Sequence, residues 1–198
     1  MCCFNLKNIS SRSKKGETIE AFLKSQNSVE AYLWIMNNID PSDAAFQKKF
    51  NDLYGLNAAR SMNKPAFYNV FAVYYHKSKF LNYAEILQDL SIATGRLEVS
   101  FGSKLLHTLK PDEPIIDKEV INKLYSCPCT GKYFYGVKKH PGNVYEAVAL
   151  HYALKDCYYS FLIPWARKTG YFTAFDAAFP QATHISEIKK IDFYLWAM

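Results

Sequence analysis

The sequence predicts an all-α protein. Residues that start and stop helices recur along the chain, and apolar residues between them repeat at helical spacing. Strand signals are few, because alternation of apolar and polar residues is short and no Asn-Gly or Asp-Gly hairpin occurs. Apolar residues make up 49% of the 198 residues, enough to bury a substantial core. We therefore expect a single all-α domain over residues 1–198, with a loose polar start over residues 1–16.

The first expected helices follow clear start signals. The segment 40–43 (DPSD) combines a capping residue, a proline suited to a first turn and acidic residues, which together predict a helix start. Apolar residues then recur at helical spacing until Gly55 stops that helix. Pro65 opens the next expected helix, whose apolar face carries Phe67, Val70, Phe71 and Tyr74.

Two further helices are expected in the middle of the chain. Asn82 with Glu85 three residues later resembles a capping box, and Gly95 ends the helix that this box begins. Ser100 opens the next expected helix, and Pro111 ends it because proline cannot continue a helix.

The last third of the chain contains the longest helical candidate. It runs from Asn143 to Ile163 and is expected to stop before Pro164. A final helix is expected to begin at Ser186, and it places Ile188, Ile191 and Leu195 on one face.

Composition excludes several classes of protein. No run of about 18 apolar residues exists, so we expect no membrane span. The first residues lack the apolar segment of a signal peptide, so the expected location is the cytoplasm. Gly-rich phosphate loops, the G-x-S-x-G elbow and the H-E-x-x-H zinc pair do not occur. No cofactor and no metal are therefore expected.

The five cysteines are best interpreted as reduced thiols, because their number is odd and no secretion signal precedes them. Cys127-Pro-Cys129 leaves a metal site open as an alternative. No second Cys or His pair follows at zinc-finger spacing, which favours two thiols at a turn.

The net charge of +6 is concentrated towards the C-terminus. Residues 121–198 carry 9 basic and 5 acidic groups, and the segment 131–140 (GKYFYGVKKH) mixes lysines with aromatic residues. Lysines attract a phosphate backbone and aromatic rings stack on exposed bases, so this segment fits nucleic acid. The alternative is an ordinary solvated loop whose aromatic rings face inward.

Asp117 is the candidate catalytic residue. It follows the proline-bracketed turn of the segment 101–120 (FGSKLLHTLKPDEPIIDKEV) and stands where a new helix begins. Its carboxylate can cap that helix, which is worth about 1 kcal/mol. The adjacent apolar segment and the cap shift a carboxyl pKa in opposite directions, and such a carboxylate also suits a general base or a cation stabiliser. Both interpretations stay open here.

His107 is the second candidate in this region. It lies near the apolar face of its expected helix, within reach of the turn that leads to Asp117. A histidine whose hydrogen bonds are satisfied inside the core is the alternative, because no nucleophile stands beside it.

The segment 101–120 resembles part of the helix-hairpin-helix base-excision DNA glycosylases. In that superfamily a helix leads through a short loop to a sequence of the type apolar-Val-Asp-Thr-His-Val. The residues that match this pattern are Pro114, Ile115, Ile116, Asp117 and Val120, whereas Lys118 and Glu119 replace Thr and His. The segment 94–101 (TGRLEVSF) and the closing KKIDFYLWAM are also similar to uncharacterised bacterial proteins of this helical layout.

The resemblance implies a fold and a chemistry. The implied fold has two helical lobes around a cleft, and the implied activity is removal of a flipped-out base with Asp117 activating water. Arg96 and Lys104 would hold phosphates, and His107 or a nearby tyrosine would orient the base.

The chain also departs from the family at the hairpin. Residues 94–99 (TGRLEV) replace the glycine-rich hairpin of the L-P-G-[IV]-G type, whose backbone amides bind a DNA phosphate. The lysine of bifunctional members has no counterpart at the equivalent spacing, which argues against lyase activity. The expected enzyme is therefore a monofunctional DNA N-glycosylase. The alternatives are a non-catalytic nucleic-acid-binding module and a protein-interaction module on the same scaffold, and the oligomeric state stays open.

Overall fold

The computed structural model describes residues 12–57, 62–77 and 81–197, with side chains from Ser25 onward. Within these ranges the chain is helical and contains no strand, which confirms the all-α prediction. In the same ranges, no helix combines the length and the apolar character that crossing a membrane requires. The helices are α1 (Arg12–Asn37), α2 (Ala44–Tyr54), α3 (Lys64–Lys77), α4 (Tyr83–Thr94), α5 (Val99–Leu109), α6 (Lys118–Ser126), η1 (Gly131–Phe134), α7 (Val144–Cys157), η2 (Tyr158–Leu162), α8 (Ile163–Thr169), α9 (Tyr171–Ala178), η3 (Pro180–Ala182) and α10 (Glu187–Ala197).

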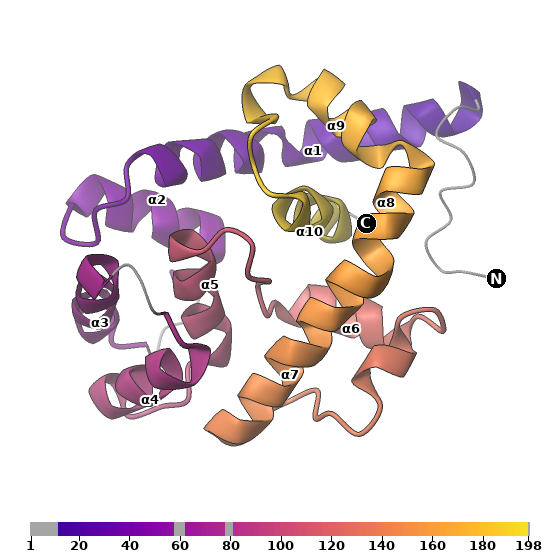
Figure 1. The fold of residues 1–198 in the computed structure, drawn as a ribbon. Helices are drawn as coiled ribbons and strands as arrows, with labels where there is room; N and C mark the ends of the chain where they lie inside the picture. The colour runs from indigo at the N-terminus through magenta and orange to yellow at the C-terminus, as the bar shows by residue number, and fades with distance from the viewer. Residues whose placement is uncertain (1–11, 58–61, 78–80, 198) are drawn as a thin grey trace.

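The helices surround α10 (Figure 1). This C-terminal helix packs against α1, α6, α8 and α9, while α3 packs on α4 and α4 packs on both α5 and α7. α1 passes along one side of the molecule and contacts α2, α9 and α10. The last helix of the chain therefore lies at the centre of the fold.

Several predicted helix ends are confirmed. Asn82 accepts a hydrogen bond from the Ala84 amide at the start of α4. Gly55 and Gly95 end α2 and α4 in the left-handed conformation, with φ of 72° and 73°. A side chain would strain the backbone at such angles, which explains why glycine occupies both positions.

The start of α2 differs from the expectation by a few residues. Asp43, not the beginning of the 40–43 segment, caps the helix by accepting from the Phe46 amide at 2.7 Å. Asp40 instead accepts from the amide and the hydroxyl of Ser42 at 2.9 and 2.6 Å. Aspartate suits both a tight turn and a helix cap, so the sequence pattern alone did not separate the two.

The expected stop before Pro164 is wrong. The helix continues from α7 through the π-helical turn η2 into α8, and Pro164 lies in the first turn of α8. Ile163 donates its amide hydrogen to the Tyr158 carbonyl, five residues back. A π turn widens the helix locally, and a first-turn position requires no N–H, so the proline is accommodated.

α1 was not expected from the sequence, because its apolar residues do not gather on one face. The expected loose start over residues 1–16 overlaps α1 at residues 12–16, and residues 1–11 lie outside the described residues.

α10 is buried on almost every side. Its apolar residues Ile188, Ile191 and Leu195 are buried, as expected from their spacing. Lys189 and Asp192 are buried with them, at 6% and 4% exposure. Charged side chains are rarely buried unless they are paired, so Lys189 and Asp192 need partners among the groups around them.

Candidate functional site

Six polar side chains from four helices meet inside the protein, and we call them the buried polar cluster. Each is at most 6% exposed. The members are Tyr32 of α1, Tyr54 of α2, Lys104 and His107 of α5, and Lys189 and Asp192 of α10. Charged groups are rarely buried unless they are paired, so each requires an account of its partners.

His107 is a neutral, fully satisfied member of this cluster. Its Nδ1 lies 2.7 Å from the Glu113 backbone oxygen, and its Nε2 lies 3.1 Å from the Tyr32 hydroxyl. A carbonyl oxygen only accepts, so Nδ1 donates and Nε2 accepts from Tyr32. Burial lowers the pKa of His107 to about 3, so the ring is neutral at pH 7. This geometry corresponds to the structural alternative for His107.

Lys104 points inward. Its ammonium donates to the Tyr54 backbone oxygen at 3.1 Å and lies 4.9 Å from the centre of the Phe101 ring. Burial lowers the pKa of Lys104 to about 8, while the Asp117 carboxylate favours the charged form. A lysine with this placement does not present its charge on the surface, where a phosphate backbone would pass.

Lys189 and Asp192 form the charged centre of the cluster. The Lys189 ammonium lies 3.9 Å from Asp192 Oδ2 and about 5 Å from the centres of the Tyr32 and Phe193 rings, at 5.1 and 4.9 Å. Burial lowers the pKa of Lys189 and raises the pKa of Asp192 to about 6. The Tyr158 hydroxyl also donates to Asp192 Oδ1. Removing one partner of such a pair leaves an uncompensated buried charge.

Asp117 caps α6 and also acts on the cluster. Its Oδ1 accepts from the amides of Glu119 at 2.9 Å and Val120 at 3.4 Å, which confirms the cap. Its negative charge favours the protonated forms of Lys104 and Lys189. Oδ2 makes no hydrogen bond within the described part of the chain. One oxygen therefore caps the helix, while the second makes no hydrogen bond in the described part of the chain.

Arg96 lies outside the buried polar cluster. It precedes α5, its side chain is 56% exposed, and its Nε lies 3.9 Å from Glu98 Oε1. The structure thus brings Asp117 into electrostatic contact with Lys104, places His107 in the same cluster, and leaves Arg96 at the surface.

A pocket lies between the start of α5 and the start of α6, and we call it the α5–α6 pocket; Asp117 itself is not among its lining residues. Its volume is about 240 Å³, and both neighbours of Asp117 in sequence, Ile116 and Lys118, line it. Lys139 and His140 from the segment 131–140 contribute to the same lining. The basic part of that segment therefore lines the same pocket as the start of α6, which sequence spacing did not reveal.

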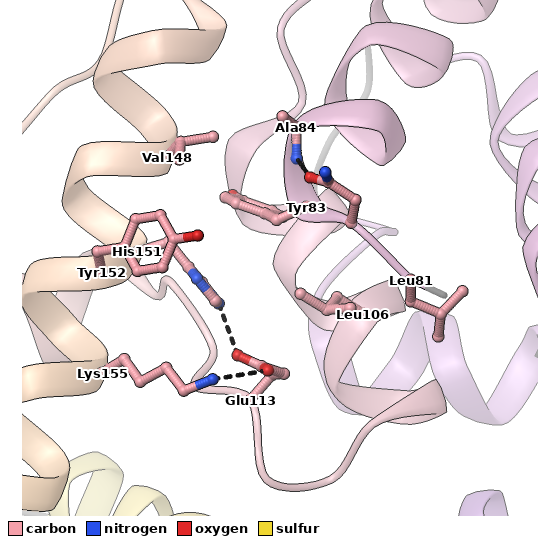
Figure 2. Close-up of a pocket in the computed structure, with 10 residues that line it drawn as sticks. Leu81, Tyr83, Ala84, Leu106, Glu113, Val148, His151, Tyr152 and Lys155 are labelled. Carbon is pink, nitrogen blue, oxygen red and sulfur yellow. Dashed lines mark hydrogen bonds and ion pairs between the residues drawn. The ribbon is translucent and has the colours of Figure 1, made fainter. Parts of the chain in front are cut away.

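A second pocket lies between α7 and the α4–α5 pair, and we call it the Glu113 pocket (Figure 2). Glu113 Oε1 lies 2.8 Å from the Lys155 ammonium, and Oε2 lies 3.8 Å from His151 Nε2. Dashed lines in Figure 2 mark these two interactions, which join the 110–117 loop to α7. The pocket volume is about 250 Å³.

Sequence reasoning missed the charged residues of α10 and the partners of Glu113. Lys189 and Asp192 lie between the apolar residues that mark the face of the final helix, and nothing in one sequence marks that helix as central. Glu113 and Lys155 are 42 residues apart, so only the fold brings them together. The one available signal was the position of Glu113 directly before Pro114, in a loop already singled out.

Comparison of the chain with protein-family models, with curated proteins and with solved structures finds no match. Among the residues that the structure describes, no group of three or more His, Cys, Asp or Glu side chains is arranged to hold a metal ion. The roles of Asp117, Arg96, Lys104 and His107 on nucleic acid stay predictions.

Proposed function

We propose that this chain is a divergent DNA glycosylase-like protein that removes a base from DNA, with Asp117 as the catalytic carboxylate. The observation that supports this function best is that the helix cap uses only one of the two carboxylate oxygens of Asp117. Oδ1 accepts from the α6 amides, Oδ2 makes no hydrogen bond within the described residues, and Ile116 and Lys118 on either side of Asp117 line the α5–α6 pocket. A fixed carboxylate of this kind can activate water or stabilise a developing sugar cation.

The surroundings of Asp117 supply a path for the phosphate backbone. Lys118 and Lys139 line the α5–α6 pocket together with His140. Val99, at the start of α5, also lines this pocket, and Arg96, whose side chain is 56% exposed, lies just before that helix in the sequence. In this proposal these surface groups hold phosphates, while Lys104 serves the electrostatics of the buried polar cluster. The two lobes of the proposed glycosylase-like fold would enclose the flipped base near Asp117.

A second candidate function is nucleic-acid binding without catalysis. Tyr135 and Tyr145 are 94% and 83% exposed, and the lysines Lys138 and Lys139 lie between them in the sequence. Exposed rings beside lysines suit stacking on unpaired bases. The interaction-module alternative remains an outcome of the same test, because it predicts no binding to nucleic acid.

The binding test uses matched lysine pairs. Binding of duplex and single-stranded DNA is measured for the wild type, for Lys118→Ala/Lys139→Ala and for Lys48→Ala/Lys49→Ala at two salt concentrations. Both double variants remove two positive charges, and Lys48 and Lys49 are exposed on α2. We predict salt-sensitive binding. The slope of log binding constant against log salt concentration should fall in magnitude by about 1 for each phosphate-binding lysine removed, and only in the first variant. Equal binding by the two double variants would overturn this placement of the DNA surface.

Catalysis is tested separately with Asp117→Asn. Asparagine caps a helix about as well as aspartate, so this variant keeps the cap and removes the charge. A screen of oligonucleotides that carry damaged bases should show base release by the wild type and a loss of about 100-fold or more in Asp117→Asn. Binding without base release by the wild type would support the second candidate function.

A further inference from the structure

The Glu113 pocket is lined by charged and polar side chains, and the proposed function does not use it. It opens between α7 and the α4–α5 pair, and Figure 2 shows Glu113, His151 and Lys155 converging at one end of it. Its link to the buried polar cluster runs through the backbone, because His107 Nδ1 donates to the Glu113 carbonyl. The Glu113 carboxylate itself faces the pocket, away from that bond.

The charges in this pocket balance. Glu113 Oε1 accepts from the Lys155 ammonium at 2.8 Å, with side-chain exposures of 18% and 36%. An ammonium has three donors, so Lys155 retains capacity after this bond. The carboxylate and the ammonium sum to zero charge, which favours a neutral ligand over an ion of either sign.

His151 contributes an acceptor that lacks a donor. Burial lowers the pKa of His151 to about 4, and its ring hydrogen-bonds the Pro114 backbone oxygen, so the ring is neutral with a lone pair on Nε2. Within the described part of the chain, buried Nε2 has no hydrogen-bond partner. Glu113 Oε2, at 3.8 Å, is too distant and is itself an acceptor. An unsatisfied buried acceptor carries a free-energy cost that a ligand donor would remove.

The remaining lining combines apolar surface with one exposed ring. Leu81, Leu106 and Val148 line the pocket together with Tyr152, which is 67% exposed. The Tyr83 ring packs against the His151 ring at a centroid distance of 4.5 Å and fixes its orientation. A ligand here therefore needs donors for two acceptors, an acceptor for Lys155, and carbon atoms that tolerate apolar contact.

We propose that the Glu113 pocket binds a neutral sugar through two hydroxyls on adjacent carbons, either as a free sugar or as the ribose of a nucleoside. A hydroxyl is the neutral group that donates and accepts at one atom. One hydroxyl donates to Glu113 Oε2 and accepts from Lys155, and its neighbour donates to His151 Nε2. The two acceptors lie 3.8 Å apart, and a single hydroxyl has one hydrogen and cannot donate to both, so two neighbouring hydroxyls are needed.

The ligand is tested by nuclear magnetic resonance titration of the full chain with four compounds. These are adenosine, 2′-deoxyadenosine, methyl ribofuranoside and methyl 2-deoxyribofuranoside, so each diol has a partner that lacks it. The proposal predicts saturable shifts of the His151 ring signals with at least one diol, and binding at least 10-fold weaker for the matched deoxy compound. Binding of adenosine alone identifies a nucleoside, and binding of both diols identifies a sugar.

Protein variants complete the test. Glu113→Gln should weaken diol binding by about 10-fold or more, because the amide offers one acceptor where the carboxylate offers two. Tyr152→Ala, at the exposed edge of the pocket, should weaken binding without a loss of fold, whereas Tyr75→Ala, an exposed tyrosine of α3 that does not line the pocket, should not affect it. Absence of binding by every compound, equal binding of the deoxy partners, or unchanged binding by both pocket variants overturns the proposal. These results are independent of DNA and of Asp117.

Discussion

At the scale of single residues, Asp117 and His107 both hold parts of the fold in place through side-chain hydrogen bonds. Asp117 caps α6 through Oδ1, and its negative charge favours the protonated forms of Lys104 and Lys189. His107 uses both ring nitrogens within the core, so its geometry corresponds to a structural role. The sequence placed both residues in one region, because the 101–120 segment carries them close together. It did not reveal the Lys189 and Asp192 charges that surround them, because those come from the opposite end of the chain.

The cap at Asp117 makes a prediction about stability. Asp117→Ala removes the acceptor for the Glu119 and Val120 amides and should lower the free energy of unfolding by about 1 kcal/mol. Asp117→Asn keeps the cap and should lose less than Asp117→Ala, and the loss that remains measures the attraction of the Asp117 charge for the ammonium groups of Lys104 and Lys189. Urea unfolding at pH 7 measures both. Equal losses in the two variants would mean that the charge, and not the cap, carries the stability.

His107 makes a prediction about pH. Its pKa falls from an ordinary value of 6.5 to about 3 in the folded protein, so its contribution is fully present above pH 6.5 and is lost as the pH falls towards 3. His151, with a pKa lowered to about 4, acts in the same direction, whereas Asp192, raised to about 6, opposes it.

A neutral substitution isolates the contribution of His107. Between pH 7 and pH 5 the wild type should lose about 2 kcal/mol more unfolding free energy than His107→Gln, which does not titrate. Urea unfolding at the two pH values gives this difference directly. A wild type and a variant that lose the same amount would show that His107 is not a buried neutral histidine.

At the scale of elements, most helix ends could be predicted from the sequence. The continuation of the helix through Pro164 and the existence of α1 could not. Asn82, Gly55 and Gly95 act locally, so the residue type alone predicted their places. Pro164 was misread because the π-helical turn before it depends on the packing of α7 and α8, which no local pattern encodes. α1 was not predicted because its apolar residues do not gather on one face, although it packs on α2, α9 and α10 in the fold.

Gly95 provides the test of a helix end. Its φ is 73°, and a Cβ built there meets nothing within 4 Å, so only backbone strain opposes a side chain. Gly95→Ala should therefore cost about 1 kcal/mol, and Gly95→Asn should cost less because asparagine tolerates this conformation. Thermal unfolding of the two variants ranks them. An alanine variant as stable as the wild type would contradict the left-handed cap.

At the scale of the whole molecule, α10 joins the parts of the fold through a buried ion pair. Its charges meet aromatic rings and hydroxyls from α1, α2 and η2, so the cluster links segments from both ends of the chain. The all-α class followed from composition and spacing, since these sum over the whole chain. The central position of α10 and the two pockets did not, because they arise from contacts between residues far apart in sequence.

The ion pair of α10 is tested by a double-mutant cycle. Asp192→Asn keeps the shape and a partner for the Tyr158 hydroxyl but leaves the Lys189 ammonium without its nearest opposite charge. This variant should lose about 3 kcal/mol of unfolding free energy. Adding Lys189→Met removes the stranded charge and should restore part of the loss. Additive effects in the cycle would show that the two side chains do not interact.

The most direct test of the central claim is base release from damaged-base oligonucleotides by the wild type and Asp117→Asn at low salt. We predict that the two proteins bind DNA with similar, salt-sensitive affinity and that only the wild type releases a base. An Asp117→Asn variant that releases the base as fast as the wild type would contradict the role of the carboxylate. A wild type that binds no DNA at low salt would contradict action on nucleic acid altogether.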